Sequence, residues 1–149
     1  MIKIICLGSI KEEFFKEAIK EYQKRLSKYT KLQIIELKDE KDGINPLKKE
    51  KENIIKHIND KDNVIILDIK GKEVTSEEFA EFINNELTNY SNMTFIIGSS
   101  NGLDEEIKDL TTKKISFSHL TFPHQLFRII LLEQIYRGFK ILNNEKYHK

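Results

Sequence analysis

Five short apolar runs alternate along the chain with segments of helical periodicity. The runs have the length of β-strands, and they span residues 2–7, 32–37, 63–69, 93–97 and 113–117. The third run is almost continuously apolar, as expected for a strand that is covered on both sides. This alternation predicts an α/β fold in one domain, with a mostly parallel sheet and helices on both faces.

The segments between the runs carry the signals of helices. Asn45 and Pro46 pair a capping residue with a first-turn proline, and Thr75 with Glu78 has the spacing of a capping box. The lysines and glutamates that follow Pro46 are expected to form a solvated face. We expect helices over 11–28, 46–58, a stretch after Thr75, a short stretch after Asp104, and 123–142.

Three loops follow apolar runs, at 67–72, 98–102 and 117–122. Gly98 and Gly102 let the second loop turn sharply and approach a ligand closely. In open α/β sheets, ligands bind outside the carboxyl ends of the strands, so the three loops together predict a binding site on one edge of the sheet. For a single glycine-containing loop, an ordinary strand-to-helix turn is the competing interpretation.

The last helix has an unusual pattern. Leu132, Ile135 and Phe139 form an apolar stripe, and Arg128 falls in line with it. A buried guanidinium needs an anion, a ligand or another subunit, unless the side chain reaches solvent at the helix end. Further apolar residues spread around most of the helix, which suggests that it is also covered in a homodimer.

Composition narrows the choice of partners and compartment. At 149 residues, with 39% hydrophobic and 33% charged residues, the sequence is typical of one soluble globular domain. No apolar run approaches the roughly 20 residues of a membrane span, so we expect no membrane partner. Cys6 is the only cysteine, which favours a reducing cytoplasm. A net charge of +1 gives no support to DNA binding, and any nucleic acid would need a local basic patch.

Standard catalytic motifs are absent from the sequence. There is no pair of histidines at metal-binding spacing and no CxxC, so no metal is expected. The 98–102 loop matches neither common phosphate-binding pattern, and no serine or cysteine stands in a nucleophile motif. Asp68 could act as a base or contact a ribose, although an aspartate after a strand is more often a turn former. His119 and His124 flank the third loop, where a single histidine is usually structural or exposed.

The chain ends in Tyr147, His148 and Lys149. Most such tails fray at the surface. Alternatively, the tyrosine could stack on a base, while the histidine or lysine contacts a phosphate or the reacting nucleotide.

Taken together, these features resemble one family. LDIKGK, FIIGSSNGL, ISFSHLTFPHQLFRIILLEQIYRGFKI and the terminal YHK resemble the SPOUT-class methyltransferases that modify N3 of a pseudouridine in large-subunit ribosomal RNA. Residues 8–29 fit the same family, so the resemblance covers essentially the whole chain. The combination TFPHQxxRxxLxEQxYR with a terminal YHK is highly specific. This sequence departs from the family pattern at Ser99 and Asn144, where glycine is usual or common, and at Gly138, where alanine is usual.

The resemblance implies a C-terminal trefoil knot (the SPOUT α/β-knot), a homodimer, and S-adenosyl-L-methionine bound within the knot. It implies three catalytic residues, Arg128, Tyr147 and His148. The implied cofactor contacts are Leu67, Gly98, Phe117, Ser118, His119, Leu120, Thr121 and Phe122.

The implied reaction transfers a methyl group to N3 of pseudouridine 1915 in a 23S rRNA stem-loop of the assembled 70S ribosome. As a hypothesis, Arg128 supplies positive charge and orients the base, while Tyr147 and His148 of either subunit hold the nucleotide. His148 could be the base, or the N3 proton could pass directly to water. The rival interpretations are another SPOUT enzyme that methylates tRNA guanine or ribose, and a flavodoxin-like binding module without catalysis.

Overall fold

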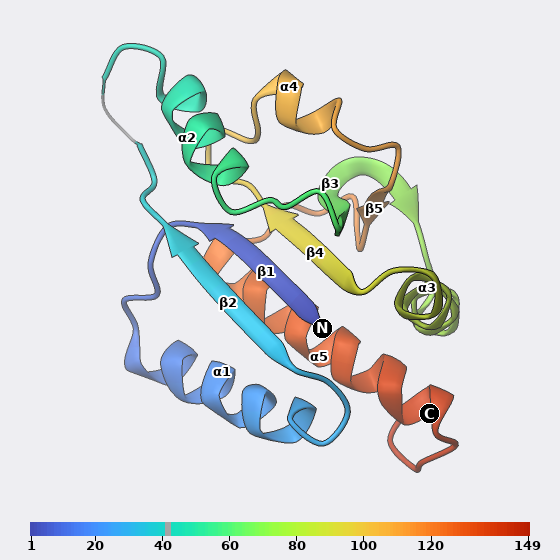
Figure 1. Cartoon of the computed structure of the whole chain (residues 1–149). Coiled ribbons are helices and arrows are strands. Elements are labelled where there is room, and N and C mark those ends of the chain that lie inside the picture. The colour runs from blue at the N-terminus through green and yellow to red at the C-terminus, as the bar shows by residue number, and fades with distance from the viewer. Residues whose placement is uncertain (41–42) are drawn as a thin grey trace.

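The computed structural model describes residues 1–40 and 43–149, and its centre is a five-stranded parallel sheet (Figure 1). The strand order is β2-β1-β4-β3-β5. The strands are β1 (Ile2–Leu7), β2 (Leu32–Leu37), β3 (Asp62–Glu73), β4 (Asn92–Ile97) and β5 (Lys114–Ser116). The predicted parallel α/β architecture is therefore confirmed.

Helices cover both faces of this sheet. They are α1 (Glu13–Leu26), α2 (Pro46–Ile55), α3 (Ser76–Asn89), α4 (Glu105–Lys108) and α5 (His124–Leu142). Helix α5 packs between α1 and α3 on one face, and α2 and α4 lie on the other (Figure 1). Each face has its own hydrophobic core, because successive strand side chains point to opposite sides. Ile4 and Cys6 pack on the α5 side, and Ile5 and Leu7 on the α2 side.

The third strand is longer than predicted. Leu67 pairs with Ile115 of β5, and after an irregularity Lys72 pairs with Ile115 again. The segment 70–72, which the sequence predicts as a loop, is therefore part of β3. Gly71 makes this possible, since a Cβ atom there would lie only 2.7 Å from the β5 backbone.

The second helix also corrects the prediction. Its N-cap residue Asn45 has φ 56° and makes no side-chain cap bond to the described residues, and the helix ends at Ile55, short of the predicted residue 58. Glu50, expected on a solvated face, is only 1% exposed. The sequence also predicts a charged loop over 38–45, of which positions 41–42 lie outside the described residues. The capping box is confirmed, because Thr75 and Glu78 exchange both hydrogen bonds.

Candidate functional site at the carboxyl edge of the sheet

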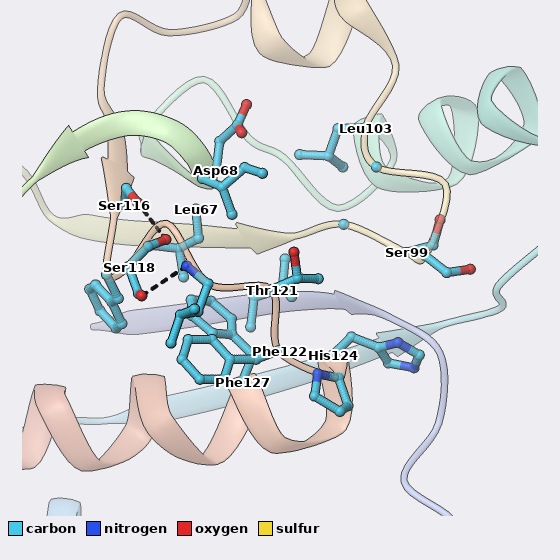
Figure 2. Close-up of a pocket in the computed structure, with 18 of the residues that line it drawn as sticks. Leu67, Asp68, Ser99, Leu103, Ser116, Ser118, Thr121, Phe122, His124 and Phe127 are labelled. Atoms are coloured by element: carbon cyan, nitrogen blue, oxygen red, sulfur yellow. Dashed lines mark hydrogen bonds between the residues drawn. The ribbon is translucent and has the colours of Figure 1, made fainter.

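A cavity of about 670 Å³ opens beside residues 67–69 of β3, where β4 and β5 end (Figure 2). Its size falls within the range of about 300–1,000 Å³ that is typical of small-molecule sites. The three segments predicted to form a site therefore do lie together, although residues 67–69 belong to β3 and not to a loop. The cavity is lined by Leu67, Asp68, Ile69, Ile97, Gly98, Ser99, Ser100, Gly102, Leu103, Lys108, Ile115, Ser116, Phe117, Ser118, Leu120, Thr121, Phe122, Pro123, His124 and Phe127.

The loop after β4 is a tight turn that brings its backbone to the cavity wall. Gly102 donates its backbone N–H to the carbonyl of Ser99 at 2.9 Å, and its φ of +82° suits glycine. A Cβ atom on Gly98 would lie 2.8 Å from the carbonyl oxygen of Gly102. Glycine at position 98 is therefore required for this turn to close.

The loop after β5 is held by its own serines. The hydroxyl of Ser116 donates to the carbonyl of Ser118 at 3.0 Å, and the hydroxyl of Ser118 accepts from the backbone N–H of Leu120 at 3.0 Å (Figure 2). These bonds leave other backbone groups of the loop at the cavity. A ligand recognised by backbone atoms leaves no side-chain fingerprint in the sequence.

Aromatic side chains form one wall of the cavity. The ring centroid of Phe127, in the first turn of α5, lies 5.5 Å from that of Phe117 and 6.2 Å from that of Phe122. The ring of Phe117 also makes an edge-to-face contact with Phe79 of α3, with the ring centroids 5.1 Å apart. Such a wall suits a flat, partly apolar ligand.

Seven of the eight predicted cofactor contacts line the cavity. The exception is His119, whose side chain is 80% exposed and lies 3.1 Å from Glu73. Asp68 also lines it, but one carboxylate oxygen accepts the backbone N–H of Lys70 at 3.0 Å, which fits the turn-forming role. Sequence reasoning assigned no role to Leu103 or Phe127. Leu103 directly follows the predicted 98–102 loop and Phe127 lies soon after the 117–122 loop, and this was the only sign in the sequence that they belong to the site.

Arg128 does not line the cavity with these residues. It is 1% exposed, and Nη1 of its guanidinium donates to Glu36 at 2.7 Å, while Nη2 donates to the carbonyl of Gly8 at 2.8 Å. The same Glu36 oxygen accepts the backbone N–H of Ile10 at 2.9 Å. The guanidinium is thus buried together with the apolar stripe, and its anionic partner is Glu36 of the same chain. Its catalytic role stays a prediction.

The chain end folds back onto α5. The hydroxyl of Tyr147 donates to Glu133 at 3.1 Å, and its ring lies under the guanidinium of Arg137 at 4.8 Å. Burial, followed by the charge of Glu133, raises the pKa of Tyr147 above its usual value. His148 lies 2.7 Å from Glu77 of α3 and 3.3 Å from Arg137.

The ordered tail and the cavity occupy different stretches of α5. Phe127 lines the cavity, and Arg137, which contacts the tail, lies ten residues further on. At 1.5 Å per residue this is about 15 Å along the helix axis. Within one chain, the structure therefore does not bring Tyr147 and His148 to the predicted cofactor contacts.

The fold and the cavity define a parallel α/β domain with a ligand-sized site at the carboxyl ends of its strands. A family model described as a predicted SPOUT methyltransferase matches residues 1–148. The chain belongs to the SPOUT methyltransferase family.

Similar proteins support this assignment over the full length. The ribosomal RNA large subunit methyltransferase H of Caldicellulosiruptor saccharolyticus is 51% identical, with 100% of both chains covered. The protein of the same name from Clostridium botulinum is 55% identical, with 99% of both chains covered. A probable methylase family protein from Haemophilus influenzae has a solved structure with a TM-score of 0.60 at 13% identity, covering 99% of this chain and 70% of that one. At that identity the likeness supports the fold alone.

Proposed function

We propose that this methyltransferase uses S-adenosyl-L-methionine to methylate N3 of pseudouridine 1915 in the 23S rRNA of the assembled ribosome. The observation that carries the proposal is the cavity formed jointly by residues 67–69 of β3 and the loops after β4 and β5. Two relatives that match the whole chain at 51% and 55% identity are named ribosomal RNA methyltransferases. The enzyme would act in the cytoplasm, where ribosomes are found.

The residues of the cavity fit the proposed cofactor. Its volume accommodates a nucleoside with an amino-acid tail, and the Phe117–Phe127 wall offers an apolar surface beside an adenine ring. The backbone groups around Gly98 and Ser118 can hydrogen-bond to the polar edges of the ligand. When bound, the cofactor supplies an electrophilic methyl group, so the protein has to align the nucleotide and accommodate the loss of the N3 proton.

A homodimer would complete this site. Leu120, at the cavity rim, is 69% exposed, and Phe14 of α1 is 63% exposed. Several apolar side chains of α5, including Leu126 and Ile129, are only partly covered within the chain. A second copy could cover these surfaces and bring its own ordered tail to the cavity. The proposal also includes the C-terminal trefoil knot that the resemblance to the family implies.

In such a dimer, Tyr147 and His148 of one subunit would hold the target nucleotide over the cavity of the other. Arg128 would supply positive charge from its fixed position between Glu36 and Gly8. A target presented by the folded ribosome also explains how a chain with a net charge of only +1 can act on RNA. The ribosome supplies shape, and the second subunit extends the contact surface.

Methylation of ribosomes from a strain that lacks the modification tests the proposal. Purified protein with S-adenosyl-L-methionine should transfer one methyl group per ribosome, and reverse transcription should stop at the candidate pseudouridine. A stop at another nucleotide would reject the proposed target. Calorimetry with S-adenosyl-L-methionine and with flavin mononucleotide tests the cofactor separately, and binding of the flavin alone would reject it.

A further inference from the structure

Behind the cavity, a buried carboxyl group contacts the loop that follows β4. We propose that Glu50 of α2 is a positioning residue, which holds the 98–102 loop in its ligand-binding shape through the hydroxyl group of Ser99. This inference rests on the proposed function only in naming S-adenosyl-L-methionine as the ligand.

Ser99 is fixed from both sides. Its hydroxyl donates to a carboxylate oxygen of Glu50 at 3.1 Å and accepts the backbone N–H of Asn101 at 3.2 Å. Its carbonyl accepts the backbone N–H of Gly102 at 2.9 Å. Because Ser99 is only 9% exposed, water competes little for these bonds. The Ser99 hydroxyl therefore fixes the shape of the turn from Gly98 to Gly102, and both glycines line the cavity.

Glu50 is itself held in place. The other carboxylate oxygen accepts the backbone N–H of Glu40 at 3.0 Å, and the residue is 1% exposed. One side chain thus connects the segment after β2, helix α2 and the loop after β4. A buried carboxyl group is costly unless its oxygens are hydrogen-bonded, and here both of them are.

The surroundings of Glu50 raise the pKa of its carboxyl group. Burial raises the pKa of Glu50, and the nearby carboxylate of Asp39 raises it further, against the bonds from Glu40 and Ser99. Both oxygens of Asp39 are buried close to Glu50. A glutamine has the same shape and places a hydrogen-bonding group at both positions, so it should replace Glu50 with little loss. Its amide group can donate to the Ser99 hydroxyl instead of accepting from it.

The contact depends on the serine that this chain carries. A glycine at position 99, the usual residue in the family that the sequence resembles, has no hydroxyl for Glu50 to hold. The loop of this chain is accordingly fixed by a side-chain hydrogen bond to helix α2.

Four variants of the full chain test the proposal: Ser99→Ala, Glu50→Ala, Glu50→Gln and the double alanine variant. The matched controls are Ser91→Ala, at the other end of β4, and Glu52→Ala, on the exposed side of α2. Calorimetry measures the affinity for S-adenosyl-L-methionine, and hydrogen exchange without ligand measures amide protection over 99–103.

Losing one buried hydrogen bond should weaken binding about fivefold to tenfold in Ser99→Ala and in Glu50→Ala, with faster exchange over 99–103. The double variant should lose no more than either single variant, because both changes remove the same bond. Glu50→Gln should stay within about twofold of wild type, as should both controls.

Wild-type affinity in Ser99→Ala would overturn the proposal, as would losses that multiply in the double variant. If Glu50→Ala fails to fold, Ser99→Ala and Glu50→Gln decide the question. If the wild-type protein binds no S-adenosyl-L-methionine, the proposed function fails, and exchange over 99–103 alone then judges the role of Glu50.

Discussion

Arg128 is the largest side chain that the structure buries completely among the described residues. Its position joins α5 to the ends of β1 and β2, through the Gly8 carbonyl and Glu36. The guanidinium has two fixed partners, and Phe127, the residue before it, lines the cavity. Such a group can stabilise the fold, take part in the chemistry or do both. Only a comparison of stability with activity separates these roles.

Replacing Arg128 by alanine should abolish methylation while leaving the affinity for S-adenosyl-L-methionine nearly intact, because the guanidinium does not line the cavity. The lost bonds should also lower the free energy of unfolding, by about 1–3 kcal/mol. Glu36→Gln serves as the control, since it removes the charge partner and keeps the guanidinium. Methylation and calorimetry are the measurements. Retained methylation in Arg128→Ala would refute the catalytic role.

Cys6 should be chemically inert in the folded protein. The thiol is fully buried in β1, and burial raises its pKa to about 12, against the opposing influence of Arg128. Since the thiolate is the reactive form, alkylation at pH 8 should be negligible until the protein is unfolded, and then complete. Mass spectrometry with and without denaturant measures this. Stoichiometric labelling of the native protein would show that β1 opens readily.

At the scale of elements, a buried ion pair ties β1 to the turn that enters β3. Lys3 donates to Asp62 at 2.5 Å and to the carbonyl of His57 at 2.9 Å, and the backbone N–H of Asn59 reaches the same Asp62 oxygen at 3.0 Å. Burial by itself would raise the pKa of Asp62. The bonds from Lys3 and Asn59 outweigh burial and hold that pKa below its usual value of 3.8.

Stability should therefore depend on the charge of Asp62. Because its pKa is lower in the folded than in the unfolded chain, the stabilisation is present above about pH 4 and is lost as pH falls through the folded value. Asp62→Asn should cost about 3 kcal/mol at pH 7, since Lys3 stays buried without its partner. Chemical unfolding at several pH values measures the difference, which should shrink below pH 4. A difference that persists at pH 2 would point to another cause.

The same scale shows which parts of the structure the sequence could predict. Apolar runs marked the strands and Thr75 with Glu78 marked a helix start, because local patterns and caps determine these features. Glu50 was misjudged because its burial depends on a contact with Ser99, about fifty positions away. The sequence predicts a loop around Gly71, whereas this glycine lets two strands approach each other. Long-range contacts of this kind leave no local pattern.

At the scale of the whole molecule, the cavity and the ordered tail lie on different stretches of α5. The meeting of the three segments around the cavity was predictable, because the carboxyl ends of parallel strands share one edge, although the first segment is part of β3 and not a loop. The place of the tail was not, since it depends on Glu133 and Arg137 holding Tyr147. A tail that is ordered away from its own cavity is suited to reach the cavity of a second copy.

Two inactive variants should therefore restore activity to each other. Gly98→Val should spoil the cavity, since its added atoms collide with Gly102, and a chain truncated after Glu145 lacks the tail. Each homodimer should be inactive, although the truncated chain should still bind S-adenosyl-L-methionine. In a mixed dimer, the intact cavity of the truncated chain faces the intact tail of its partner. Unfolding and refolding equal amounts together should recover about a quarter of wild-type methylation, because half the dimers are mixed and each has one complete site.

The alternative arrangement gives a different result in the same experiment. If each tail served its own cavity, no chain in the mixture would have both parts, and the refolded sample would stay inactive. A truncated chain with full activity on its own would instead show that the tail is idle. Mass measurement of the refolded sample confirms that mixed dimers have formed, so an inactive mixture then rules out a site shared between subunits.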